Sequence, residues 1–134
     1  MVNRYKQKGS AKERILRDKL YNRGLLVFRI AGSGSTRKIP ATDLIVVYKG
    51  KTIGLEVKSA QKLRNFRISD TQIAKLIEIS KHLEVWFAVY IKGIGWKFVR
   101  FEGCRVINKY DIEKGLNIDQ FVSYIKNERI LNNI

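Results

Sequence analysis

Two acids and one amine are spaced so that two neighbouring strands would bring them together. Residues 41–48 and 51–59 are rich in β-branched and apolar residues, and the Lys-Gly pair between them suits a tight hairpin turn. With that turn, counting back along both strands sets Asp43 opposite Glu56. Lys58 follows two residues after Glu56, so strand alternation brings its amine to the same face. The spacing therefore predicts a carboxylate pair beside an ammonium group.

Such a pair in an apolar sheet needs a proton or a cation, because like charges in a cross-strand pair repel and desolvation adds to the cost. One Cys and one His cannot build a structural zinc site or a disulfide framework, so any metal must be held mainly by carboxylates. Mg²⁺ is the expected ion, because it is hard and prefers oxygen ligands. The alternative is a solvated Asp43 with a surface Glu56–Lys58 ion pair, worth about 0 to 1 kcal/mol.

Glu13 is a third candidate ligand, on a helix predicted over residues 10–23. It shares a helical stripe with Leu16 and Leu20, which is the side expected to face inward. A capping box explains the same residue differently, since Ser10 can bond the third amide of the helix while Glu13 reaches back. Both interpretations stay open, and one residue can serve both.

The elements that must position these side chains alternate between helix and strand in the order α-β-β-β-α-β-β-α. Ser69 is the expected cap of the second helix, and Gln72 is expected to complete that capping box rather than to contact the site. The other expected elements are a strand over 25–30, a small polar loop over 31–38, a hairpin of 85–91 with 96–101, and a helix from 118 to about 130. This order predicts an α/β fold with a mixed five-stranded sheet flanked by helices.

Composition predicts one folded domain over residues 1–134 that binds a polyanion. The 134 residues include 45% hydrophobic ones and carry a net charge of +15, which favours nucleic acid over an anionic membrane surface. The net charge of residues 1–40, 41–100 and 101–134 is +9, +6 and 0, so the basic surface should lie in the first two thirds, unless it is merely a solvated basic surface. No secretory or membrane segment is recognisable, which predicts a soluble cytoplasmic protein.

The ordered residues resemble a known family. The string Lys8–Arg14 (KGSAKER), then Arg29 before a Gly/Ser loop, then Asp43 and the triplet Glu56–Lys58 are similar to the archaeal-type Holliday junction resolvases of the PD-(D/E)xK nuclease superfamily. The similarity covers residues 8 to about 100. One departure is that Thr42 stands where the superfamily name implies Pro.

The resemblance implies a restriction-endonuclease-like core and a homodimer that nicks opposed strands of a four-way DNA junction. It implies that Glu13, Asp43 and Glu56 hold Mg²⁺, for which Mn²⁺ can substitute, and that Lys58 orients or activates the attacking water. It also matches Ser33 or Ser35 to a loop serine near the scissile strand. The basic residues expected to contact DNA, from the resemblance or from the charge pattern, are Lys8, Arg14, Arg29, Arg37, Lys38 and Arg67.

Two other functions fit the same residues. One is a restriction- or repair-type endonuclease on the same core, and the other is a basic DNA-binding protein without catalysis. The Gly/Ser loop matches neither phosphate-binding glycine pattern, so no nucleotide cofactor is expected. The last helix carries Phe121, Val122 and Ile125 and could bury either a dimer face or part of the monomer core.

Overall fold

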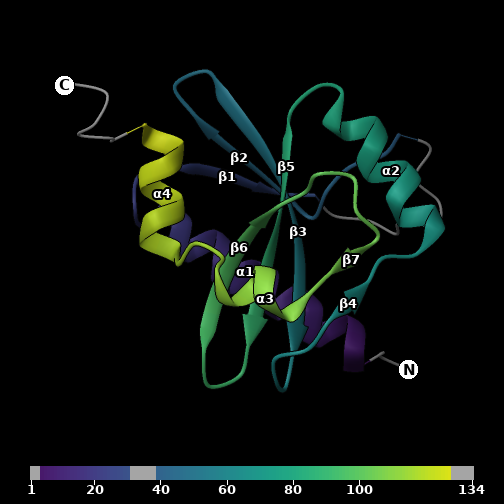
Figure 1. Cartoon of the computed structure of the whole chain (residues 1–134). Coiled ribbons are helices and arrows are strands. Elements are labelled where there is room, and N and C mark those ends of the chain that lie inside the picture. The colour runs from purple at the N-terminus through teal and green to yellow at the C-terminus, as the bar shows by residue number, and fades with distance from the viewer. Residues whose placement is uncertain (1–3, 31–38, 128–134) are drawn as a thin grey trace.

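A five-stranded sheet forms the centre of the protein (Figure 1). The computed structural model describes residues 4–30 and 39–127, with side chains from Ser10 onward in the first range. The strand order is β1-β2-β3-β5-β6. These strands are β1 (Leu26–Arg29), β2 (Leu44–Tyr48), β3 (Lys51–Ala60), β5 (Glu84–Ile91) and β6 (Gly95–Arg100). The β3–β5 pair is parallel and the others are antiparallel, so the predicted mixed five-stranded sheet is confirmed.

Helices cover both faces of the sheet, because the strands alternate apolar side chains between them. Buried residues of α1 (Arg4–Tyr21) and α4 (Ile118–Lys126) pack in one core cluster with Trp86 and Ala88. Those of α2 (Asp70–Ser80) and α3 (Lys109–Glu113) pack in the other with Phe87 and Val89. The apolar residues of α4, which could have formed a dimer face, belong to the first cluster: Phe121, Val122 and Ile125.

The predicted hairpin register is confirmed. Tyr48 pairs with Lys51 and Leu44 with Leu55, and the turn residues Lys49 and Gly50 have φ of 44° and 85°, as a type I′ turn requires. The strand begins later than predicted, at Leu44 rather than at residue 41. Asp43 therefore lies one step before β2, at the position next to Glu56.

The first helix begins earlier than predicted, and the capping box at Ser10 is wrong. The helix α1 starts at Arg4, so Ser10 lies in its interior, where its hydroxyl has no free first-turn amide to cap. The residues before Ser10 are mostly good helix formers, and the one glycine among them costs about 1 kcal/mol without stopping the helix. The inward stripe is confirmed by Leu16 and Leu20, which are fully buried.

Three short elements were not predicted. The strands β4 (Phe66–Arg67) and β7 (Val106–Ile107) form a two-stranded sheet, and α3 follows them. Two-residue strands and a five-residue helix are too short to show a periodicity in sequence. The last helix ends at Lys126 rather than near residue 130, because Asn127 adopts a left-handed conformation with φ of 55° and caps it.

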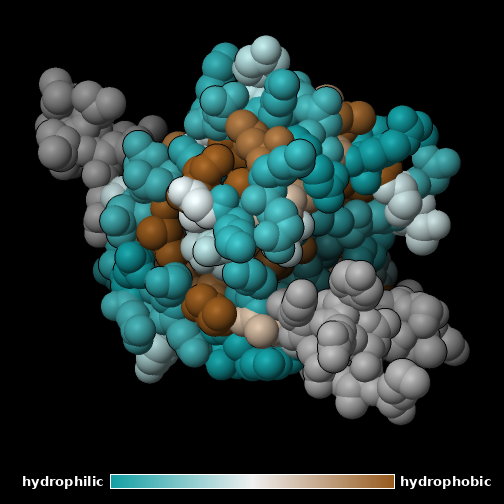
Figure 2. All heavy atoms as spheres, turned by 90° about the horizontal axis from the view of Figure 1, so that it is seen from below, coloured by the Kyte–Doolittle hydropathy of each residue, from teal (hydrophilic) through white to brown (hydrophobic). Residues whose placement is uncertain are grey.

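The face of the protein in Figure 2 is largely hydrophilic, in agreement with its high net charge. Hydrophobic side chains lie in smaller groups between the hydrophilic ones. Among the helices of the described residues, none is long and apolar enough to cross a membrane.

Candidate active site

Glu56 is the centre of the candidate site, because it is the buried acid of the sheet. Its side chain is 3% exposed. One carboxylate oxygen, Oε2, accepts a hydrogen bond of 2.8 Å from Nε2 of Gln72. The other, Oε1, is buried without a hydrogen-bond partner, and the nearest cation is Nζ of Lys75 at 3.7 Å. A buried carboxylate oxygen without a partner is rare and marks a place where a further group fits.

Lys58 is joined to this carboxylate through the same glutamine. Its Nζ donates a hydrogen bond of 2.9 Å to Oε1 of Gln72, whose Nε2 contacts Glu56. The predicted carboxylate and ammonium on one face of β3 are therefore present, with an amide between them. The expectation that Gln72 serves only the capping box is wrong: Ser69 accepts from the Gln72 amide as predicted, but the Gln72 side chain points to the site.

Asp43 is held beside Glu56 by the backbone of β3. Its Oδ2 accepts a hydrogen bond of 2.8 Å from the amide of Val57, and its carbonyl accepts from the amide of Ile30. The preceding residue, Thr42, is 1% exposed and donates its hydroxyl to the carbonyl of Leu44 at 2.8 Å. Thr42 therefore orders the chain at the point where the superfamily name implies a proline.

Glu13 reaches the same region from α1, but it is engaged by Arg29. The guanidinium donates to Oε1 of Glu13 at 2.9 Å and to the hydroxyl of Ser10 at 2.8 Å. The Glu13 and Arg29 side chains are 17% and 25% exposed, so this ion pair is half-buried. Arg29, which was expected to meet phosphate, neutralises an acid here.

The electrostatics of the site favour an added positive charge. Burial, and then the charge of Asp43, raise the pKa of Glu56 to about 7, against the lowering effect of Lys75 and Lys58. Burial and Asp43 also raise the pKa of Glu13, although Arg29 opposes them. Burial, with a smaller contribution from Lys75, lowers the pKa of Lys58. The acids are thus short of positive charge although four cations, Arg14, Arg29, Lys58 and Lys75, stand near them.

The residues present fit a divalent cation through a pair of acids. Asp43 and Glu56 are neighbours, and Oε1 of Glu56 is the oxygen that no group in the described residues satisfies. Within residues 4–30 and 39–127, no group of three or more His, Cys, Asp or Glu side chains is arranged to hold a metal. To join Asp43 and Glu56 as a ligand, Glu13 would have to give up or share its ion pair with Arg29.

The other predicted residues lie around this centre or outside the described part. Arg14 and Arg67 are exposed, on α1 and β4. Lys8 lies in α1 at a position whose side chain is outside the description. The loop residues Ser33, Ser35, Arg37 and Lys38 fall outside the described residues. Sequence reasoning missed Lys75, although its place one helical turn after Gln72 was a usable signal.

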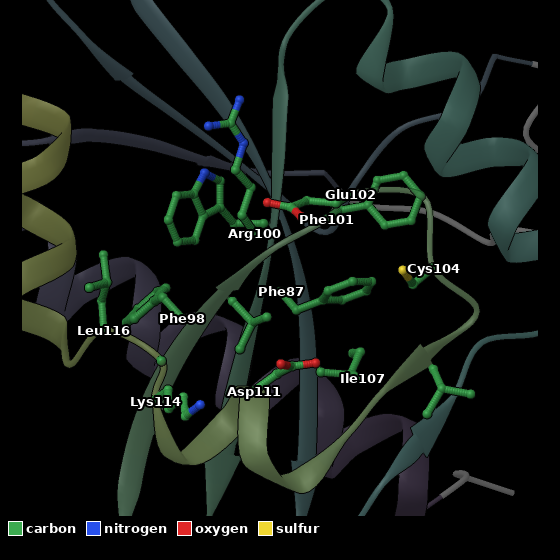
Figure 3. A pocket seen from close by; sticks show the side chains of 14 residues that line it. Phe87, Phe98, Arg100, Phe101, Glu102, Cys104, Ile107, Asp111, Lys114 and Leu116 are labelled. Atoms are coloured by element: carbon green, nitrogen blue, oxygen red, sulfur yellow. The ribbon is translucent and has the colours of Figure 1, made fainter.

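A cavity of about 310 Å³ lies elsewhere (Figure 3). Its walls come from β5, β6, α3 and the segments before and after α3, including Phe87, Phe98, Phe101, Ile107 and Leu116. None of the candidate site residues lines it. The candidate site is thus a cluster at the sheet, not this hollow.

Nearly the whole chain is similar to known proteins. A family model described as archaeal Holliday junction resolvase (Hjc) matches residues 4–130. The crossover junction endodeoxyribonuclease Hjc of Sulfurisphaera tokodaii is 28% identical over 136 residues, 95% of this chain and 94% of that protein. The Sulfolobus acidocaldarius protein of the same name is 31% identical over 130 residues, 90% of each chain.

The fold is also shared with a solved structure. The Archaeoglobus fulgidus protein Hjc, described as a Holliday junction resolvase from an archaeal hyperthermophile, superposes with a TM-score of 0.74. It is 22% identical, and the match covers 85% of this chain and 99% of that one. With the family model matching nearly the whole sequence, this chain belongs to the archaeal Holliday junction resolvase family.

Proposed function

We propose that this chain is a Mg²⁺-dependent endodeoxyribonuclease that nicks opposed strands of a four-way DNA junction as a homodimer in the cytoplasm. The observation that carries the proposal is the buried, unsatisfied Oε1 of Glu56, adjacent to Asp43 and linked through Gln72 to Lys58. Family membership and the names of the relatives support the choice of junction DNA as substrate. The net charge of +15 supports a phosphate-rich partner.

The proposed roles follow from position. Asp43 and Glu56 would hold the ion, with Glu13 joining them when Arg29 moves to a DNA phosphate. When bound, Mg²⁺ would lower the pKa of a water molecule and stabilise negative charge on the phosphate. Lys58, half-buried and held by Gln72, would orient the water or bind charge that develops at the phosphorus.

The remaining basic residues and the loop serines complete the proposal. Arg14 and Arg67 are exposed and free to meet phosphates, and Lys8, Arg37 and Lys38 would add to the same surface. Ser33 or Ser35 would lie near the scissile strand. Mn²⁺ is expected to replace Mg²⁺, because both accept carboxylate oxygen ligands.

The proposed homodimer would use an apolar part of the sheet. On β1, Leu26 and Phe28 are 49% and 50% exposed, and they pair across the strands with Val47 and Ile45, so all four side chains share one face. None of the four belongs to either core cluster of the described residues. A second copy is the occupant that fits, because two opposed nicks need two sites and these four uncharged side chains avoid repulsion between two highly basic chains.

The interface is tested by the oligomeric state of the full chain. The substitution Phe28→Ser should shift the protein from dimer to monomer in sedimentation experiments over a range of concentrations. The matched control is Ile94→Ser, since Ile94 is a comparably exposed apolar residue at 52% in the β5–β6 turn. A monomeric parent would refute the homodimer, and a dimer that survives the Phe28 substitution would refute this interface.

The activity is tested with a synthetic four-way junction in Mg²⁺ or EDTA. The parent should cut the junction in Mg²⁺ but not in EDTA. Asp43→Asn or Glu56→Gln should reduce the cleavage rate more than about 100-fold, because each removes a proposed ligand. The exposed Asp18, which forms an ion pair with its neighbour Arg17, supplies the control Asp18→Asn. Variants that cut as well as the parent would show that the site is wrong.

Duplex and single-stranded DNA at equal concentrations separate the other functions. Equal cleavage of duplex and junction would favour a restriction- or repair-type endonuclease. Strong, salt-sensitive binding without cutting in any divalent metal would favour a non-catalytic DNA-binding protein.

A further inference from the structure

The helix α2 reaches both oxygens of Glu56 from one side. Gln72 and Lys75 lie about one helical turn apart and therefore project from the same face of the helix. Gln72 contacts Oε2 at 2.8 Å, and Lys75 stands 3.7 Å from Oε1. The helix is fixed against the sheet by Ile73, Leu76 and Ile79, which are all buried. Its two polar side chains are therefore presented to the carboxylate from a rigid support.

Gln72 contributes orientation without charge. Its amide donates through Nε2 to Glu56 and accepts through Oε1 from Lys58, and a neutral amide is suited to doing both at once. These bonds fix the carboxylate so that Oε2 is already bonded and Oε1 remains open. A ligand held in place before binding loses less conformational freedom when the ion arrives, and partners of this kind strengthen metal binding.

Lys75 contributes charge without a hydrogen bond. At 3.7 Å its ammonium attracts Oε1 electrostatically, yet Oε1 has no hydrogen-bond partner. The Lys75 side chain is 32% exposed, so it can swing into solvent. A divalent cation at Oε1 would be repelled by this charge and would compete with it for the same oxygen.

We propose that α2 sets the metal affinity of the site through two positioning residues with opposite effects. Gln72 strengthens ion binding by orienting Glu56, and Lys75 weakens it by competing for Oε1. The inference rests on the metal site of the proposed function. It adds that the crossover helix, which supplies no proposed ligand, determines how much Mg²⁺ the site needs.

Metal binding by the full chain without DNA provides the test. Titration calorimetry with Mn²⁺ and with Mg²⁺ would compare the parent with Gln72→Met, Gln72→Asn and Lys75→Met. Both Gln72 variants should weaken binding roughly 10- to 100-fold, as loss of a ligand's hydrogen-bond partner does. Lys75→Met should tighten binding by about 3- to 10-fold, and added NaCl should shrink that gain, because the Lys75 effect is electrostatic.

The matched control is Lys81→Met, which removes the same charge from the end of α2, where Lys81 is paired with Glu78. It should leave metal affinity unchanged. Thermal unfolding in EDTA shows whether each variant folds. Methionine has nearly the length of glutamine, and Gln72→Asn keeps an amide that is too short to reach, so the asparagine variant decides the matter if the methionine variant does not fold.

The outcomes separate this inference from the proposed function. If the parent binds metal and both Gln72 variants bind it equally well, the role of Gln72 is refuted. If Lys75→Met weakens binding, or tightens it no more than Lys81→Met, the competition is refuted. A parent that neither binds metal nor needs it to cut the junction would refute the proposed metal site itself, and the inference with it.

Discussion

At the scale of single residues, ionised Glu56 lowers the stability of the folded protein. Its pKa is raised to about 7 by burial and by Asp43, whereas a glutamate in an unfolded chain titrates near 4.3. The folded state therefore binds this proton more tightly than the unfolded state does. Stability falls as pH rises from about 4.3 through 7 and changes little from this group above that range.

Replacing this acid by an amide should therefore stabilise the metal-free protein in a pH-dependent way. One pKa unit corresponds to about 1.4 kcal/mol, so Glu56→Gln should gain up to about 3 kcal/mol of unfolding free energy at pH 8 relative to its effect at pH 4. Urea unfolding in EDTA at pH 4, 6 and 8 measures this difference. A gain that does not change with pH would contradict it.

The sequence predicted the site residues on β3 and just before β2 because strand geometry is regular. A two-residue turn and a period of two were enough to place Asp43, Glu56 and Lys58 near one another. Helical periodicity likewise placed Glu13 on the inward side of α1. It wrongly made Ser10 the cap, because a capping signal is local and the helix continues past it toward the N-terminus. The Arg29–Glu13 ion pair could not be predicted from the sequence, because it depends on how α1 packs against β1.

At the scale of the elements, the contact between β3 and the residues just before β2 controls the position of the Asp43 carboxylate. Gly54 lies against Thr42, and a Cβ built on Gly54 would come within 2.8 Å of Thr42 Oγ1 and 2.9 Å of its Cγ2, and within 3.1 Å of Leu83 Cδ1. No ordinary side chain fits without movement. Because Thr42 precedes Asp43, a displaced Thr42 would also shift the carboxylate.

The substitution Gly54→Ala should therefore affect both stability and cleavage. Overpacking of a filled core costs about 1 to 3 kcal/mol, and Mg²⁺-dependent junction cleavage should fall with it. The double variant Thr42→Ala with Gly54→Ala should recover part of both losses, because it removes the two closest atoms. Urea unfolding and cleavage rates of the four proteins of this cycle measure the coupling, and strict additivity would count against it.

The elements that sequence reasoning placed best are those with a long regular pattern. The hairpin of β5 and β6 and the helix α2 follow their periodicity closely, including the cap at Ser69. The β4–β7 pair depends on two segments far apart in the chain, and no local pattern announces it. Gln72 shows the limit most clearly: its backbone serves the predicted cap, and only the packing of α2 on β3 shows that its side chain serves the site.

The charge distribution should control DNA affinity at the scale of the whole molecule. With a net charge of +15 concentrated in the first two thirds, junction binding in EDTA should weaken steeply as salt increases. Arg67→Gln should lower the slope of log K against log salt by about one. Lys114→Gln removes an exposed charge from the electrically neutral last third and should leave the slope unchanged.

Fluorescence anisotropy with a labelled junction at several salt concentrations measures these slopes. Neither substitution touches the acid pair, so metal affinity serves as the internal control. If both substitutions lowered the slope by the same amount, DNA contact would not be confined to the basic first two thirds.

The parallel pairing of β3 and β5 has a consequence for the newly made chain. These strands are joined by the crossover that contains α2, and parallel pairing is a non-local step that tends to come late in folding. Until that step, Glu56 and Lys58 lack Gln72, the amide partner that they share. The candidate site is therefore among the last parts of the newly made chain to be completed.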